Sequence, residues 1–258
     1  MHTESEHVDF PVLFEDAWCI VVCKPSGILT QAPPGIDSME VRAKRYLQTR
    51  SDSEQLPYLG VPHRLDRPAS GVMIFAKTRN AARKLAEQFQ RRTVKKTYWA
   101  LVAGKTADSG HWVDFMHKVE GEPRAEVVEE SHPEAQRAEL RYVKRGDCNE
   151  VSWIEIELIT GRTHQIRLQA GSRGFPILGD VMYGSQQRFG IQHEDTRLNA
   201  IALHARCLQL SHPQSRAALT LEAPVPHAWS SIVANENTFS GVAEKVERDD
   251  GTHTTKAV

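Results

Sequence analysis

The stretch HRLDRPASG, residues 63–71, places one carboxylate, Asp66, between the guanidinium groups of Arg64 and Arg67, just before an apolar run. A carboxylate in a half-buried loop loses hydration energy unless a cation or hydrogen-bond donors compensate. An arginine beside Asp66 would keep the carboxylate ionised near neutral pH, which a nucleophile or a general base requires. An ordinary ion pair that fixes a charged turn explains the same residues, and the local pattern alone favours this structural explanation.

Two further segments carry side chains suited to chemistry, KKTYWALVAG at residues 95–104 and GRTHQIRLQ at residues 161–169. Tyr98 could stack on a nucleobase while the neighbouring lysines hold phosphates, but a strand aromatic taken by itself more often faces the core. Arg167 would stand one turn into a helix capped by Thr163, from where it could reach a neighbouring loop and pair with Asp66. Spacing in the sequence does not decide which arginine makes that pair.

Twelve histidines raise the question of a metal site, and His63, Asp66, His164 and His204 form an imaginable ligand set. Against it, the sequence has no His-x-x-x-His or Cys-x-x-Cys spacing. It also has no G-x-G-x-x-G or Walker phosphate loop. We therefore expect neither a metal nor a cofactor. The cysteines are expected to be reduced and structural: Cys19, Cys23, Cys148 and Cys207.

The charge distribution indicates a local anion-binding surface on a nearly neutral protein. The net charge is −1, and setting aside the five acidic residues of positions 1–16, which include no Lys or Arg, leaves +4 for the remainder. Within residues 79–97, Glu87 is the only acidic residue among seven basic ones. The structural alternative is a solvated helix face, whereas clustering favours a docking site for phosphates. The predicted phosphate contacts are Arg79, Arg83, Lys84, Arg91, Arg92, Lys95 and Lys96.

The segments that must position these groups predict an α+β fold, a mixed and mainly antiparallel sheet with peripheral helices. Short apolar runs between turn residues predict strands, and apolar residues at helical spacing predict helices. The expected strands are a hairpin within residues 12–27 and single strands at 72–77, 94–104, 138–145, 152–160, 202–212 and 217–224. The expected helices cover residues 38–50, capped by Ser38, and residues 79–91, 163–173 and 226–236.

Residues 11–238 are expected to form one domain, between a flexible acidic N-terminus at 1–10 and a disordered polar tail at 239–258. No apolar stretch reaches the length of a membrane span, and the acidic start is unlike a signal peptide. We therefore expect a cytoplasmic monomer without membrane contact.

Together these segments resemble the RluA family of pseudouridine synthases. HRLDRPASGVMIFAK resembles the catalytic motif of that family, KKTYWALVAG its tyrosine motif and GRTHQIRLQ its basic motif. ILGDVMYG and LHARCLQLSHP follow in the family's order, so the resemblance covers residues 11–232. It implies the pseudouridine synthase fold and the isomerisation of uridine to pseudouridine in RNA, without a cofactor or a metal.

The resemblance implies roles for individual residues. Asp66 would attack the target uridine and break its N-glycosidic bond, and the detached uracil would rejoin the ribose through carbon 5. Tyr98 would stack on the uracil, Arg167 would pair with Asp66, and Leu168 would help to wall the base pocket. Arg64 would push into the RNA where the target nucleotide has flipped out. The remaining expected substrate contacts are His63 and Arg67.

Two departures from the family pattern bear on the substrate. The acid-Thr pair that usually follows HRLDR is Pro68-Ala69 here, so a hydroxyl contact at position 69 is lost. The first catalytic strand begins by about residue 11, which leaves no room for the small RNA-binding domain of many relatives. RNA selection would then come from the catalytic domain, which favours a compact stem-loop of rRNA or tRNA. Ser70 and Gly71 would let the loop approach the substrate closely.

Two other functions compete with this interpretation. A hydrolase could use Asp66 with Glu155 or Glu157 as a carboxylate pair, but strand alternation can put both glutamates on a solvent face. That function also leaves Tyr98 and GRTHQIR without a role. An RNA-binding protein of the same fold without activity is the second alternative, and the intact Asp66, Tyr98 and Arg167 argue against it.

Overall fold

A ten-stranded mixed sheet is the framework of the computed structural model, which describes residues 10–51 and 55–229. The strands follow the order β1-β2-β3-β9-β4-β8-β7-β5-β6, and β10 pairs with β9 beside this path. Every pairing is antiparallel except that of β3 with β9. The strands are β1 Val12–Glu15, β2 Cys19–Lys24, β3 Ser70–Ala76, β4 Lys95–Ala103, β5 Ser109–Lys118, β6 Ala125–Val128, β7 Gln136–Cys148, β8 Val151–Leu158, β9 Leu203–Ser211 and β10 Ala218–Glu222.

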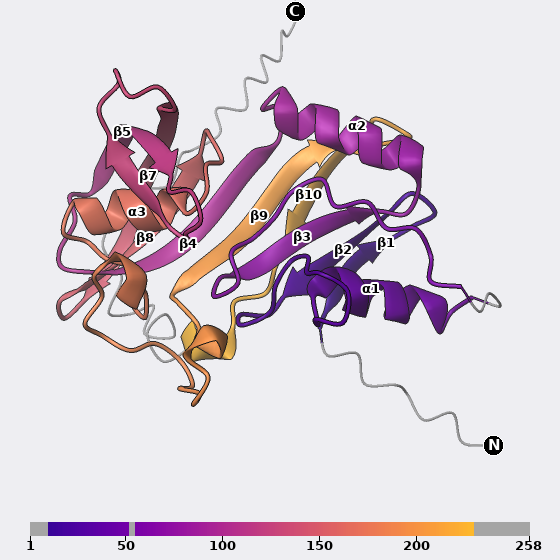
Figure 1. The fold of residues 1–258 in the computed structure, drawn as a ribbon, viewed down its shortest axis with the longest axis horizontal. Helices are drawn as coiled ribbons and strands as arrows, with labels where there is room; N and C mark the ends of the chain where they lie inside the picture. Colours follow the sequence, from indigo (N-terminus) through magenta and orange to yellow (C-terminus); the bar gives the residue numbers. More distant parts are fainter. Residues whose placement is uncertain (1–9, 52–54, 230–258) are drawn as a thin grey trace, which may run out of the picture.

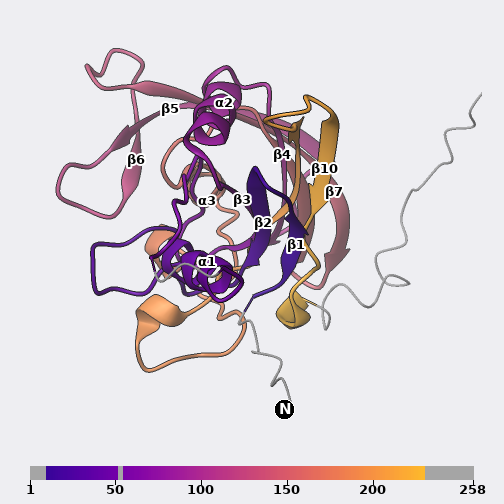
Figure 2. The same ribbon diagram turned by 90° about the vertical axis from the view of Figure 1, so that its right-hand side faces the viewer.

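The helices lie at the periphery of this sheet. Figure 1 shows α1 and α2 beside the β1–β2–β3 end, whereas α3 lies at the β5–β7 end. Figure 2 shows α1 and α2 on one side of β1 and β2. The predicted fold class, a mixed and mainly antiparallel sheet with peripheral helices, is confirmed. The helices of the described residues are α1 Met39–Gln48, α2 Arg79–Gln90, α3 Gln165–Ser172 and the short 3-10 helices η1 Val181–Tyr183 and η2 Thr196–Leu198.

Local sequence explains most of these elements. Every residue of β2 and β3 is buried, as expected of continuous apolar runs in the middle of a sheet. Ser38 caps α1 by accepting a hydrogen bond from the backbone of Val41, and Thr78 caps α2 through the backbone of Ala81. The predicted hairpin, helices 38–50 and 79–91, and the strands from 72 to 224 are therefore confirmed to within three residues at their ends.

The start of α3 differs from the prediction. The helix begins at Gln165, and its N-cap is His164, in a left-handed conformation with φ 55° and without a capping side-chain bond. Thr163 therefore does not cap the helix. Instead, the side-chain oxygen of Gln165 accepts hydrogen bonds from the Arg162 backbone at 3.0 Å and from the Thr160 hydroxyl at 2.7 Å. The Gln165 side-chain nitrogen donates to the Glu139 carbonyl in β7 at 3.1 Å, a tertiary contact that holds the start of the helix without the predicted cap.

The sequence analysis predicted no strand at β5 or β6. Within β5 only Trp112 and Met116 are buried, so the alternation of apolar and polar residues is weak. The long strand β7 supplies the hydrogen-bonding partner that makes β5 a strand. Partly exposed strands such as these leave little signal in the sequence, because their backbone pairing does not depend on which side chains they carry.

Several other expectations can be followed only in part. The predicted terminal segments at 1–9 and 239–258 and residues 230–236 of the last predicted helix lie outside the described residues. All four cysteines are free of disulfide bonds, as predicted. Within residues 10–51 and 55–229, none of the helices combines the length and the apolar character that crossing a membrane requires.

Gly71 allows β3 to pair with β9 directly after the HRLDRPASG loop. Its φ is 125°, and a Cβ atom on it would lie 2.3 Å from the carbonyl oxygen of Ala205 in β9. The close approach that this glycine permits is therefore to the β9 backbone rather than to a substrate. Ser70 is likewise buried, where its hydroxyl lies 2.8 Å from Nδ1 of His204.

We expect Gly71→Ala to lower the free energy of unfolding by about 3 kcal/mol or more, because a backbone atom cannot move aside as a side chain can. Gly35→Ala is a matched control, since Gly35 also has a positive φ, 85°, but no atom lies within 4 Å of the added Cβ. Its cost should be about 1 kcal/mol, that of the left-handed backbone alone. Urea denaturation measures both, and equal losses would contradict the argument.

Candidate active site

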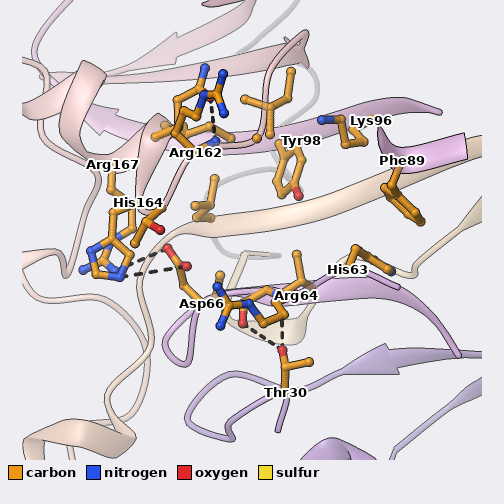
Figure 3. Close-up of a pocket in the computed structure, with 18 of the residues that line it drawn as sticks. Thr30, His63, Arg64, Asp66, Phe89, Lys96, Tyr98, Arg162, His164 and Arg167 are labelled. Atoms are coloured by element: carbon orange, nitrogen blue, oxygen red, sulfur yellow. Dashed lines mark hydrogen bonds and ion pairs between the residues drawn. The ribbon is translucent and has the colours of Figure 1, made fainter. Parts of the chain in front are cut away.

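A cleft of about 700 Å³ lies where the 62–69 loop, β4 and the start of α3 meet. Asp66, Tyr98 and Arg167 all line this cleft, although they come from three separate segments of the chain (Figure 3). Among the described residues that line it, Asp66 carries the only carboxylate. Such a cleft has a positive potential suited to a polyanion. Its basic side chains are Arg64, Arg67, Arg92, Lys96, Lys118, Arg162 and Arg167.

The loop that carries Asp66 is held from below by residues that the sequence analysis did not single out. The Thr30 hydroxyl donates to the Leu65 carbonyl at 2.9 Å and accepts from the Leu65 N–H at 3.1 Å. The Arg67 carbonyl accepts from the backbone of Gly27 at 2.8 Å and from Nζ of Lys24 at 3.2 Å. The backbone on both sides of Asp66 is therefore fixed, which leaves the carboxylate, 28% exposed, directed into the cleft.

Lys24 is the most unusual of these supports because its side chain is fully buried. Its Nζ also donates to the carbonyls of Pro25 and Ile28, both at 2.9 Å, so all three ammonium hydrogens have acceptors. Burial lowers the pKa of Lys24 to about 7, and the nearby charge of Asp66 opposes that shift. A buried lysine under the reactive loop is detectable in the sequence only as the polar end of an apolar strand.

Arg167 pairs with two carboxylates in the interior. Its Nη1 lies 3.4 Å from Asp66, while its Nε and Nη2 donate to Asp180 at 2.7 and 2.8 Å. Burial opposes the charge of Arg167, but the hydrogen bonds and charge of Asp180 outweigh it and raise its pKa. The guanidinium also lies over the Tyr183 ring, 5.1 Å from the centroid. The Asp66–Arg167 pair agrees with the sequence analysis, which assigned no role to Asp180.

His164 stands close to the same carboxylate. Its Nε2 lies 4.0 Å from Asp66, and its Nδ1 is 2.9 Å from the Tyr183 hydroxyl. Burial lowers the pKa of His164 despite the opposing charge of Asp66, so the imidazole is neutral at pH 7. The left-handed backbone at this residue aims the ring at the carboxylate, a placement that no local sequence pattern indicated.

Tyr98 is buried. The stacking hypothesis from the sequence had assumed an exposed side chain. It extends from β4 into the cleft and packs with the hydrophobic core at the same time (Figure 3). Burial, helped by the charge of Asp66, raises the pKa of the phenol. Tyr98 therefore stays protonated at neutral pH and offers a flat apolar surface beside the carboxylate.

The basic residues expected to contact the RNA separate into two groups. Arg64, Arg67, Arg92 and Lys96 line the cleft with Asp66. The other five, on the outer side of α2 or beside it, do not line it in the part of the chain that the structure describes: Arg79, Arg83, Lys84, Arg91 and Lys95. Arg91 pairs with Glu87 at 2.7 Å, and Arg79 lies over the Tyr58 ring. Nothing in the cleft depends on these five.

The structure corrects one predicted contact, Leu168, and places another, His63, at the cleft. Leu168 packs with Met116, Ala125 and Ala138 and is not among the described residues that line the cleft. Leu168 is buried in this small apolar cluster, whereas Gln165, Ile166 and Arg167 before it line the cleft. His63 lines the cleft as a neutral group, because burial lowers its pKa to about 3 and its Nε2 accepts a hydrogen bond from the Ile74 backbone.

The carboxylate pair of the hydrolase hypothesis does not form. Glu155 accepts hydrogen bonds from Trp99 and Arg145, and Glu157 lies 3.9 Å from Arg141. Neither glutamate is among the described residues that line the cleft. Asp66 therefore has no second carboxylate of the kind that glycoside hydrolysis uses.

Asp16, Cys19 and His212 form the one close group of potential metal ligands among the described residues, outside the cleft. His212 Nδ1 accepts from the backbone of Ser215 at 3.0 Å, so Nε2 carries the proton and donates to Asp16 at 2.7 Å. Both imidazole nitrogens are thus in use. The ligand set considered from the sequence, with His63 and His204, is not brought together.

The fold and the cationic cleft around one carboxylate are features of a class of RNA-modifying enzymes. Residues 19–172 match the family described as RNA pseudouridylate synthase, a range that includes Asp66, Tyr98 and Arg167. The chain belongs to this family and is an isomerase that converts uridine in RNA to pseudouridine.

Among the relatives, the ribosomal large subunit pseudouridine synthase C of Haemophilus ducreyi is 32% identical, with 86% of this chain and 68% of the relative covered. The ribosomal large subunit pseudouridine synthase D of Nitrosomonas europaea is 34% identical, with 89% and 66% covered. The chain thus spans about two thirds of the length of these relatives. The fold is that of human RNA pseudouridylate synthase domain containing 4, with a TM-score of 0.70 at 23% identity over 88% of this chain and 92% of that chain.

Proposed function

We propose that Asp66 is the nucleophile of the isomerisation. The observation that carries this proposal is that Asp66 is the single carboxylate among the described lining residues, held beside Arg167 and Tyr98. A carboxylate can act as a nucleophile that forms a covalent intermediate, and the Arg167 guanidinium lies 3.4 Å from this one.

The reaction that we propose conserves every atom of the nucleotide. Attack by Asp66 on the target uridine allows the N1–C1′ bond to break, the uracil turns within the cleft, and a C5–C1′ bond forms. The proton from C5 is lost and N1 gains one, so the product is an isomer and no oxidant, reductant or second substrate takes part. In the last step, the bond between Asp66 and the ribose or the base breaks, which restores the free carboxylate.

The other cleft residues have supporting roles in this proposal. The neutral Tyr98 ring packs against the uracil, and Arg167 positions the carboxylate through its rigid attachment to Asp180. Because the target atoms of a stacked base are inaccessible, the uridine must flip out of the RNA. The exposed Arg64 at the cleft occupies the place that the base leaves.

We infer that the substrate is a structured RNA, either rRNA, as the names of the relatives suggest for those proteins, or a tRNA stem-loop. The monomeric state and the cytoplasmic location stay predictions.

Pseudouridine mapping by mass spectrometry, with a label specific for pseudouridine, tests the substrate. RNA from cells with and without the gene identifies the missing sites, and the purified protein is then given the matching RNA as a short hairpin and as an assembled particle. We expect conversion of the hairpin. Conversion of assembled ribosomal particles alone would contradict the hairpin hypothesis.

A further inference from the structure

The cleft extends past Tyr98 to a second group of cations, Arg92, Lys96 and Arg162, which we call the cationic triad. They come from the turn after α2, from β4 and from the loop before α3. Lys96 and Tyr98 are two residues apart on one strand, so their side chains point to the same face, as Figure 3 shows. Along the strand this spacing is roughly 7 Å. The triad therefore lies beside the position that the proposed function gives to the uracil.

No member of the triad has a carboxylate partner within the described part of the chain. Lys96 Nζ donates to the Thr160 carbonyl at 3.3 Å and lies next to Gly161. Arg162 Nε donates to the Arg137 carbonyl at 3.1 Å. These neutral acceptors use only part of the donor capacity of the two side chains and leave their charges uncompensated.

The charge of Arg92 opposes the charges of Lys96 and Arg162. Burial, and then the charge of Arg92, lowers the pKa of Lys96 to about 8. The same two causes lower the pKa of Arg162. A bound anion would reverse this repulsion, since it would favour the charged form of each group.

The backbone at Arg92 supports the same interpretation. Arg92 follows the C-cap of α2 with φ 57°, a left-handed position at which helices usually carry glycine. The left-handed backbone disfavours an arginine at this position, yet Arg92 is one of the residues that line the cleft. Local stability therefore does not explain the residue.

We propose that the cationic triad binds one backbone phosphate of the substrate RNA next to the flipped uridine and so sets which uridine reaches Asp66. The proposal rests on the proposed function for the position of the uridine. Contacts to phosphates fix the register of a nucleic acid on a protein without reading its bases. Guanidinium and ammonium groups together supply the charge-assisted hydrogen bonds that a phosphate accepts.

The first test measures equilibrium binding of an RNA hairpin with a loop of uridines by fluorescence anisotropy. The full chain carries Asp66→Asn, so that the RNA is not converted during the titration. We expect Lys96→Met and Arg162→Ala each to weaken binding by about tenfold or more, and each to reduce the slope of log affinity against log salt by about one. Lys96→Met keeps an apolar side chain at the strand position, so packing is largely preserved.

Lys105→Met is the matched control, because Lys105 is exposed, pairs with Glu150 and is not among the described residues that line the cleft. It removes the same charge from the protein but should change the affinity by less than about twofold. Equal effects of Lys96→Met and Lys105→Met would mean that the triad attracts RNA only through the overall charge of the protein, and would overturn the proposal.

The second test changes the RNA instead of the protein. Each loop phosphate in turn is replaced by a neutral methylphosphonate. One replacement should weaken binding to the protein with an intact triad, and the same replacement should have little further effect on Lys96→Met or Arg162→Ala. If every replacement weakens binding equally in all variants, no single phosphate occupies the triad and the proposal fails.

Two further readouts separate a binding role from a structural role. Arg92→Gly should raise the midpoint of thermal unfolding by a few degrees while it weakens RNA binding, whereas a structural arginine would lower the midpoint. The affinity of the protein with Lys96 should fall between pH 7 and pH 9 more steeply than that of Lys96→Arg. The groups that act on Lys96 are Arg92, which stays charged, and His63, which stays neutral. The buried Lys24, with a pKa of about 7, also loses charge in this range, but it is present in both proteins, so the difference between them reports Lys96.

The outcomes for the two proposals are distinguishable. If Asp66→Asn still converts uridine, the proposed nucleophile is wrong, but the binding comparisons remain valid because isomerisation leaves every phosphate in place. If affinity, salt dependence and phosphate preference are unchanged in Lys96→Met and Arg162→Ala, the triad is wrong even where Asp66→Asn is inactive.

Discussion

Asp66→Asn is expected to abolish pseudouridine formation and to leave RNA affinity nearly unchanged. The amide of asparagine has the shape of the carboxylate but is not a nucleophile, so the rate constant should fall on the order of 10⁴-fold or more. The fold should persist, because Arg167 keeps its two hydrogen bonds to Asp180. Loss of one negative charge from a cationic cleft should not weaken the binding of a polyanion.

Single-turnover conversion of the RNA site found by mapping measures this effect. Glu157→Gln provides the control, since Glu157 is an exposed carboxylate on β8 that is not among the described lining residues. It should convert RNA at the rate of the unmodified protein. A rate for Asp66→Asn within tenfold of that control would remove Asp66 from the role of nucleophile.

The second large effect concerns the buried ion pair between Arg167 and Asp180, whose side chains are 5% and 2% exposed. Removing Arg167 leaves Asp180 as an unpaired buried charge, and removing Asp180 leaves Arg167 only its longer contact with Asp66, at 3.4 Å. Arg167→Ala and Asp180→Ala should therefore each lower the free energy of unfolding by about 3–5 kcal/mol. The double variant should lose less than the sum, because neither of the two buried charges is then left without the other.

Denaturant unfolding of the two single variants and the double variant measures the coupling. Arg197→Ala is the control, because Arg197 and Asp195 form an exposed pair at 2.8 Å, 74% and 37% exposed. That exposed pair should contribute no more than about 1 kcal/mol. Additive losses in the Arg167 and Asp180 variants would mean that the two side chains act independently, contrary to their bidentate geometry.

The sequence identified the elements whose formation depends on local interactions. The apolar runs of β2 and β3 and the capping side chains of Ser38 and Thr78 are visible in the sequence because they act within a few residues. The strands β5 and β6 escaped prediction because their stability comes from pairing with β7 and with each other. The cap of α3 was wrong for the same reason, since Gln165 is held by contacts outside its own helix.

What the sequence determined by itself is the set of reactive groups: a carboxylate among arginines, a tyrosine after lysines and a basic helix start, in an order that defines the family. Only the tertiary structure decided which of them meet. Arg167 reaches Asp66 across 101 positions of the chain, and Lys24 supports the loop from a different strand. Local propensities cannot specify such contacts, because they arise when distant elements pack, and burial then sets the charge of each group.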